Sequence, residues 1–509
     1  MAPTLIAFIG YLLFMLAIGL FFMRRSSGRL DEYLLGGRGL GSWVTAMSAQ
    51  ASDMSGWLLM GLPGAIYMMR GGGGWGDIWC AVGLALGTLC NWLFVAPRLR
   101  VYSEKTRSMT IPSYLANRFR DPTGAMRMLG TLITLLFFTV YVSTGLVAAG
   151  KLFESMLGVD YRVAVGVGAA VILSYTFMGG YLAVCWTDLV QGGLMFFALV
   201  AAPVMCYLKN PDVDFAADWA ARHMTAFPDG VTPAAVLGIV SALVWGLGYF
   251  GQPHILTRFM SVRDRRELPK STAIAMVWVF VSLGMAAVMA LLAMPDAVTQ
   301  QLWGAAPDAK GAETIFIRMV QAYFSPWIGG VLLAALLSAI MSTIDSQLLV
   351  CSSTLTEDMY KRLSSRSVPE RRLVLLSRLF VAVIALLALG IALMDLETIF
   401  IVVKFTWGGF GAAFGPVILF SLHSRRMKWP TALAAMFVGL SVMLAWRFAG
   451  LGTYMYELLP GFLAGTATCL VGNALCPQRD AEILAEFDAV RTEVMQESGK
   501  RPSPLAASF

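Results

Sequence analysis

The sequence predicts an all-α integral membrane protein. Of its 509 residues, 58% are hydrophobic and only 14% are charged, and the mean hydropathy is +0.69. Apolar runs of about 20 residues, the length that an α-helix needs to cross a bilayer, recur along the whole chain. A soluble chain of this size would form two or three domains with amphipathic helices and about a quarter charged residues. This composition excludes a soluble globular fold.

We expect about thirteen transmembrane helices. The first apolar run has no basic segment before it and is followed by its arginines, which is typical of a span and not of a cleavable signal peptide. The expected spans are residues 5–23, 42–68, 75–97, 125–150, 161–179, 183–208, 236–257, 272–294, 325–356, 373–393, 396–421, 429–448 and 452–474.

Lys and Arg collect in alternate loops. The basic clusters follow the first, third, seventh, ninth and eleventh expected spans, at residues 24–38, 98–127, 258–270, 361–378 and 425–428. By the positive-inside rule these loops are cytoplasmic, which places the N-terminus outside and the C-terminal tail inside. Because topology explains the net charge of +7, we expect no nucleic-acid partner.

No segment indicates catalysis or ATP-driven pumping. The three histidines at positions 223, 254 and 423 are scattered, and the chain has no G-x-x-x-x-G-K-[ST] phosphate-binding loop. The tail, residues 476–509, is short and charged, with an amphipathic helical stretch near 479–496. We therefore expect neither an enzyme nor an obligate protein partner.

Two expected spans are interrupted by polar and helix-breaking residues. The second contains SAQASDMSGW (48–57), and the seventh contains WGLGYFGQPH (245–254), which is rich in glycine and includes Pro253. Inside a bilayer, such breaks persist only where the freed backbone groups line a cavity or bind a ligand. The breaks are five spans apart, as in transporters of the leucine-transporter fold, where two inverted five-helix repeats each begin with a broken helix. Close helix packing is the alternative explanation for glycines in a span.

The ninth expected span carries a stripe of hydroxyl groups. Ala339, Ser342 and Thr343 fall within one helical turn, as do Ser342, Asp345 and Ser346. Hydroxyl and carbonyl oxygens suit a hard cation such as Na⁺. Hydrogen bonding of each hydroxyl to its own helix backbone is the alternative. A carboxylate buried in a span, such as Asp53, also indicates function because of its cost in the bilayer.

These residues resemble the sodium/proline symporters of the sodium:solute symporter family. The resemblance rests on YLLGGRGLG (33–41), ASDMSGWLLMGLPGA (51–65), WTDLVQ (186–191), WGLGYFGQPHILTRFM (245–260), MSTIDSQLLVCSS (341–353) and FGAAFGPV (410–417), and it extends to about residue 475. It implies one extra N-terminal span and two further C-terminal spans around the repeats. The expected division is 1–41 (extra span and loop), 42–208 (first repeat), 209–235 (extracellular loop), 236–421 (second repeat), 422–475 (C-terminal spans) and 476–509 (cytoplasmic tail).

The resemblance also implies the site residues. A Na⁺ site would use the backbone carbonyls of Ala51, Met54 and Ala339 with the hydroxyls of Ser342 and Thr343, and Asp53 would support it. The proline pocket would involve Ser55, Gly56, Trp57, Tyr141, Trp245, Tyr249 and Pro253. Aromatic faces would enclose the pyrrolidine ring, and free amides at half-helix ends would receive the carboxylate.

Three further carboxyl or amine groups lie outside this set. Asp188 in the sixth span, with Asp345 and Ser346, suggests a second cation or proton site, and a hydrogen-bonded structural pair is an equal alternative. Lys404 in the eleventh span is expected to reach the outer interface toward Asp395 or Glu397, and a role in an outer gate or contact with the substrate carboxylate is the alternative.

The sequence therefore predicts a Na⁺-coupled secondary symporter that imports L-proline across a plasma membrane of the bacterial inner-membrane type. A symporter of another small amino or carboxylic acid is one alternative. The other is a membrane sensor built on a transporter-like domain, for which the tail supplies no signalling module.

Overall fold

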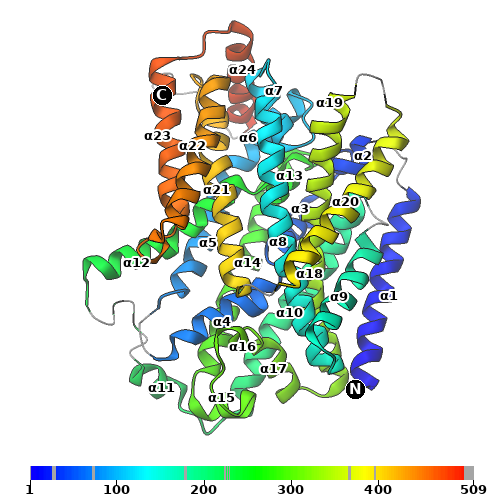
Figure 1. Ribbon diagram of the computed structural model, residues 1–509, viewed down its shortest axis with the longest axis vertical. Helices are drawn as coiled ribbons and strands as arrows, with labels where there is room; N and C mark the ends of the chain where they lie inside the picture. The colour runs from blue at the N-terminus through cyan, green and yellow to red at the C-terminus, as the bar shows by residue number, and fades with distance from the viewer. Residues whose placement is uncertain are drawn as a thin grey trace.

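The computed structural model describes residues 2–25, 30–71, 75–176, 180–222, 225, 227, 230–364, 368–394 and 397–497. These residues form helices joined by loops, and an isolated β-bridge links Leu40 and Val262. Most long helices run along the long axis of the molecule (Figure 1). The all-α architecture predicted from composition is confirmed.

The helices of the first half of the chain surround the first break. They are α1 (Ala2–Arg25), α2 (Leu30–Leu35), η1 (Gly36–Arg38), α3 (Ser42–Asp53), η2 (Trp57–Gly61), α4 (Leu62–Tyr67), η3 (Met68–Gly71), α5 (Ile78–Cys90), η4 (Asn91–Val95), α6 (Ala96–Lys105), α7 (Ile111–Phe119), α8 (Ala125–Leu157), α9 (Tyr161–Thr176), α10 (Tyr181–Lys209) and α11 (Phe215–Ala221).

The helices of the second half contain the second break. They are α12 (Pro233–Leu243), η5 (Val244–Gly251), α13 (Pro253–Met260), η6 (Arg265–Glu267), α14 (Leu268–Ala293), α15 (Asp296–Trp303), α16 (Ala309–Ala312), α17 (Ile315–Tyr323), α18 (Pro326–Ser353), η7 (Thr354–Tyr360), α19 (Lys361–Leu363), α20 (Glu370–Ala392), α21 (Ile399–His423), α22 (Trp429–Phe448), η8 (Leu451–Thr453), α23 (Leu458–Leu475) and α24 (Ala481–Glu497).

Eleven helical stretches of the described residues are long and apolar enough to cross a membrane. The two other expected spans fail this test for different reasons. Residues 42–68 are divided by the break between α3 and η2, and α9 is 16 residues long, with 177–179 of that expected span outside the described residues. The count of thirteen therefore stays a prediction.

The two ends of the bundle differ in charge. Figure 1 places α2, α7, α19 and α24 at one end, which we call the basic end because the Lys and Arg clusters lie there, and α11, α15, α16 and α17 at the other. The expected amphipathic helix near 479–496 is confirmed as α24. It buries Ile483, Phe487 and Val490, and its Asp488 pairs with Arg425 at 2.8 Å. The end of the described chain is thus fixed to the loops of the basic end.

Glycines allow the broken helix η5 to contact its neighbours through the backbone. A Cβ added at Gly87 of α5 would lie 2.2 Å from the carbonyl oxygen of Gly246, and one at Gly251 would lie 2.2 Å from the carbonyl oxygen of Phe410 in α21. Such distances exclude any side chain at these positions. Close packing is therefore one real reason for the glycines, although it does not account for the break itself.

Replacing Gly87 with leucine should prevent α5 from reaching η5. We expect a loss of stability larger than the about 1–3 kcal/mol typical of overpacked side chains, because the obstacle here is backbone. Thermal unfolding in detergent, followed as the fraction of monodisperse protein, measures this. Gly284→Leu in α14 is the control, since a Cβ there meets nothing within 4 Å. Equal stability of the two variants would contradict the packing of α5 on η5.

Candidate transport site

The first helix break lies between α3 and η2, where the sequence predicted it. Met54 has backbone angles φ −92° and ψ 80°, outside the helical region, and its side chain is buried. The N–H of Ser55 donates to the carbonyl of Asp53 at 3.2 Å and is therefore diverted from the carbonyl of Ala51, its partner in a regular helix. The Ala51 carbonyl is thus freed inside the bundle.

Hydroxyl groups of α18 reach this freed carbonyl. Ser342 Oγ donates to the Ala51 oxygen at 2.7 Å and lies 3.2 Å from the Ala339 oxygen. Thr343 Oγ1 lies 3.4 Å from the Ala51 oxygen and 3.2 Å from the Ala339 oxygen. Four of the five groups predicted to bind Na⁺ therefore meet in one buried cluster, which we call the oxygen cluster. The fifth, Met54, lies at the break itself.

The second break lies between η5 and α13. The 3₁₀ helix η5 ends at Gly251, Gln252 is extended with φ −83° and ψ 104°, and Pro253 opens α13. Pro253 suits this position because the first turn of a helix requires no backbone N–H donor there. Gln252 Nε2 donates to the carbonyls of Gly248 at 3.1 Å and Trp407 at 3.3 Å, which satisfies backbone groups near the break.

Aromatic side chains connect the two breaks. The rings of Trp57 and Trp245 stack with centroids 6.4 Å apart and an angle of 25° between their planes. Trp407 donates from Nε1 to the Trp245 carbonyl at 2.9 Å and packs edge-on against Tyr249. Gly56 lets α8 approach, since a Cβ there would lie 2.9 Å from the Cβ of Ala148.

Asp53 ties the two broken helices together. Its Oδ2 accepts a hydrogen bond from the Tyr249 hydroxyl at 2.6 Å, and its carbonyl accepts one from Trp57 Nε1 at 3.1 Å. Its Oδ1 and the buried hydroxyl of Tyr141 have no hydrogen-bond partner within the described residues. Because buried polar atoms are nearly always paired in proteins, these two atoms are candidate contacts for a bound solute or water.

A second polar cluster contains an arginine that the sequence analysis assigned to a cytoplasmic loop. Arg258 lies in α13 with a fully buried side chain, so that assignment is wrong. Its NH2 lies 3.3 Å from Asp188 Oδ2 and 2.5 Å from Ser346 Oγ, and its Nε donates to Ser48 Oγ at 3.0 Å. A guanidinium thus already pairs with Asp188 and Ser346, and Asp345 is buried on the same helix as Ser346. Arg258 lies within the segment WGLGYFGQPHILTRFM (245–260), shortly after the second break. That position was the sequence signal that could have indicated a buried arginine.

Lys404 does not pair with either expected carboxylate in the described structure. Its ammonium lies 4.9 Å from the ring centroid of Tyr456, a cation–π contact, and no ion pair joins it to Glu397; Asp395 lies outside the described residues. Its charge also acts on Asp77, which precedes α5: burial raises the pKa of Asp77, and Lys404 opposes that shift.

Unpaired polar atoms also lie between the breaks and the basic end. Gln50 Oε1, both amide atoms of Asn91 and Gln347, and both ring nitrogens of His254 are buried without a hydrogen-bond partner among the described residues. They come from α3, η4, α18 and α13. Water or a passing solute would satisfy them.

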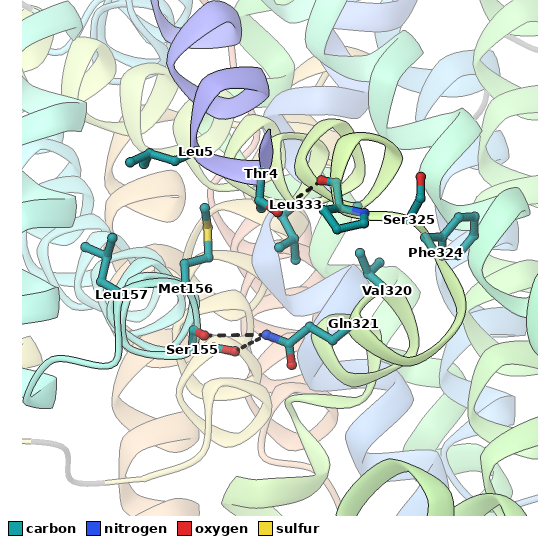
Figure 2. A pocket seen from close by; sticks show the side chains of 12 residues that line it. Thr4, Leu5, Ser155, Met156, Leu157, Val320, Gln321, Phe324, Ser325 and Leu333 are labelled. Carbon is teal, nitrogen blue, oxygen red and sulfur yellow. Dashed lines mark hydrogen bonds between the residues drawn. The ribbon is translucent and has the colours of Figure 1, made fainter. Parts of the chain in front are cut away.

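A separate cleft lies where α1 meets α8, α17 and α18 (Figure 2). Its volume is about 280 Å³, and Gln321 crosses it to donate to Ser155 Oγ at 2.8 Å. None of the predicted site residues lines this cleft. The oxygen cluster and the aromatic pair are therefore enclosed elsewhere in the bundle.

Known proteins share both the sequence and the fold. The model of the sodium:solute symporter family matches residues 33–439. The high-affinity proline transporter of Bacillus subtilis is 44% identical and the sodium/proline symporter of Escherichia coli 40% identical, over 95% and 97% of this chain and 100% and 99% of theirs.

Solved transporters with little sequence identity have the same fold. The structure of a Na⁺-coupled sialic acid symporter covers 94% of this chain and 99% of its own, with a TM-score of 0.77 at 19% identity. Mhp1, a nucleobase-cation-symport-1 transporter, covers 90% and 97% with a TM-score of 0.57. These neighbours confirm the leucine-transporter-like fold predicted from the two breaks. With its broken helices, its oxygen cluster and these relatives, the chain belongs to the sodium:solute symporter family.

Proposed function

We propose that this protein imports L-proline together with Na⁺ by alternating access. The observation that carries the proposal is the contact of Ser342 and Thr343 with the freed carbonyl of Ala51, beside two stacked tryptophans. The names of the relatives, which are proline transporters at 40–44% identity over nearly the full chain, support proline as the solute.

Na⁺ is proposed to bind at the oxygen cluster. The carbonyls of Ala51 and Ala339 and the two hydroxyl oxygens are uncharged, compact oxygen ligands, which suits a hard monovalent cation. The hydroxyls donate hydrogen bonds to these carbonyls. Na⁺ would replace those bonds, with the Met54 carbonyl at the break as the fifth ligand. Asp53 supports the site by holding Tyr249 against the first break.

Proline is proposed to bind between the breaks. Trp57 and Trp245 offer apolar faces for the pyrrolidine ring, while Gly56 supplies an amide and Ser55 a hydroxyl for the carboxylate. The unpaired hydroxyl of Tyr141 is a further donor. Tyr249 and Pro253 complete the wall from the second broken helix.

Coupling between Na⁺ binding and proline binding would follow from residues that the two proposed sites share. The turn from Ala51 to Trp57 contributes to both sites, so an ion that fixes this turn also fixes the amides that receive proline. A ligand shifts a conformational equilibrium only by its differential affinity, and the effect is mutual.

The orientation is proposed from charge. The basic end would face the cytoplasm, with the start of α1 outside, and the unpaired atoms of Gln50, Asn91, His254 and Gln347 would line the route of release toward that end. Lys404 would act near the outer end through Tyr456 and Asp77.

The second cation site at Asp188, Asp345 and Ser346 remains a proposal. Arg258 neutralises Asp188, and Asp345 is a second carboxylate buried in α18 that would bind an additional Na⁺ or proton. The site predicts that Asp345→Ser lowers the number of cations carried per proline, measured from the reversal potential in proteoliposomes. Ser338→Ala, one turn or more away on the same helix, is the control. A wild-type ratio of one Na⁺ per proline that is unchanged in Asp345→Ser would contradict the second site.

Removing both hydroxyls of the oxygen cluster should abolish Na⁺-driven accumulation of proline. We expect uptake of labelled L-proline by proteoliposomes of Ser342→Ala with Thr343→Ala to fall at least about tenfold under an inward Na⁺ gradient, because each lost ligand weakens the ion site by about 1 kcal/mol or more. An equal K⁺ gradient gives the background.

The matched control for this experiment is again Ser338→Ala. Its hydroxyl is buried in α18 and donates to the Ala334 oxygen of the same helix at 2.8 Å. Accumulation that persists in the double variant would place the ion elsewhere. If wild-type protein accumulates no proline, the solute assignment fails and other small acids are tested next.

A further inference from the structure

A lateral groove at the basic end combines apolar walls with an unpaired cation. It lies between η4, η5, α21 and α23 and has a volume of about 670 Å³. The apolar wall includes Phe94, Leu419, Phe420 and Leu470. Phe94 and Leu470 are 54% and 56% exposed, so the groove opens to the surroundings of the helices, which in a membrane are lipid.

The rim of the groove is positive. Arg426 lines it, and within the described chain its guanidinium has no hydrogen bond or ion pair, whereas neighbouring Arg425 is neutralised by Asp488. Arg98 adds a second positive charge near this rim, where its NH1 donates to the carbonyl of Leu422 at 2.8 Å. No carboxylate is among the residues that line the groove.

A buried amide adds a polar contact at this rim. Asn473 lines the groove and is 9% exposed; its Nδ2 donates to Ser424 Oγ at 3.0 Å, and its Oδ1 has no donor among the described residues. An unsatisfied acceptor next to an unpaired cation fits a headgroup that carries both a phosphate and hydroxyl donors.

We propose that this groove binds one anionic phospholipid from the leaflet at the basic end. The phosphate would pair with Arg426, and an acyl chain would lie between Phe94 and Leu470. Basic pockets between transmembrane helices on the cytoplasmic side bind anionic headgroups in this way. A soluble anion would leave the apolar wall without an occupant, and a neutral lipid would leave the arginine without one.

The groove reaches the second helix break. Phe250 forms part of its lining and immediately precedes Gly251 and Gln252, where η5 ends. An acyl chain against Phe250 would therefore contact a helix that must move during alternating access. Occupancy of the groove would favour the conformation in which Phe250 is packed as it is here.

Native mass spectrometry of the full-length protein tests the proposal without relying on transport. The protein is exposed to phosphatidylglycerol or phosphatidylcholine at equal concentrations, and retained lipid is counted. We expect about fivefold more retained phosphatidylglycerol than phosphatidylcholine on wild type, and loss of this preference in Arg426→Gln. Arg372→Gln, at an exposed position near the start of α20, is the charge-matched control and should keep the preference.

A second variant tests the apolar part. Ala474→Trp fills the groove and leaves every charge in place, and it should lower retention of phosphatidylglycerol about as much as Arg426→Gln. The proposal is overturned if Arg426→Gln keeps the preference for phosphatidylglycerol. It is equally overturned if Arg372→Gln loses as much of that preference as Arg426→Gln does. It is also overturned if soluble glycerol phosphate displaces the lipid, since the site would then bind a free phosphate ester.

Discussion

The structure depends on one requirement: a backbone carbonyl freed in the middle of a membrane helix must find a partner away from water. Here the carbonyl of Ala51 is freed by the turn at Met54, and Ser342 of α18 supplies the partner at 2.7 Å. The same turn positions Trp57 and the amides beside it. A polar break that would be costly alone is proposed to serve as a binding site because a second helix brings hydroxyls to it.

The second broken helix is held by different means. Glycines let η5 contact α5 and α21 through the backbone, and Tyr249 reaches across to Asp53 at 2.6 Å. Trp245, which also lies in η5, stacks on Trp57 of η2. One carboxylate and one aromatic pair therefore join the two breaks, and coupled transport of an ion and a solute would use this connection.

Much of this arrangement could be predicted from local sequence, because polar residues and clustered glycines within apolar runs are visible without tertiary contacts. The meeting of Ala51 with Ser342 came from the family resemblance and not from spacing. Arg258 was misassigned because charge counting cannot distinguish a loop arginine from one buried against Asp188. The contact of Lys404 with Tyr456 joins distant parts of the chain, and no local pattern indicates it. Two of the expected spans missed the length test, one because a break divides it and the other because α9 is 16 residues long.

The central claim is that one broken segment serves both ligands. Equilibrium binding of labelled Na⁺ and labelled proline to the purified protein, each at several fixed concentrations of the other, tests it most directly. The account predicts that each ligand tightens binding of the other by the same factor, in the range of about 5 to 150. Proline binding with an affinity that does not change between Na⁺-free and Na⁺-saturated buffer would contradict it.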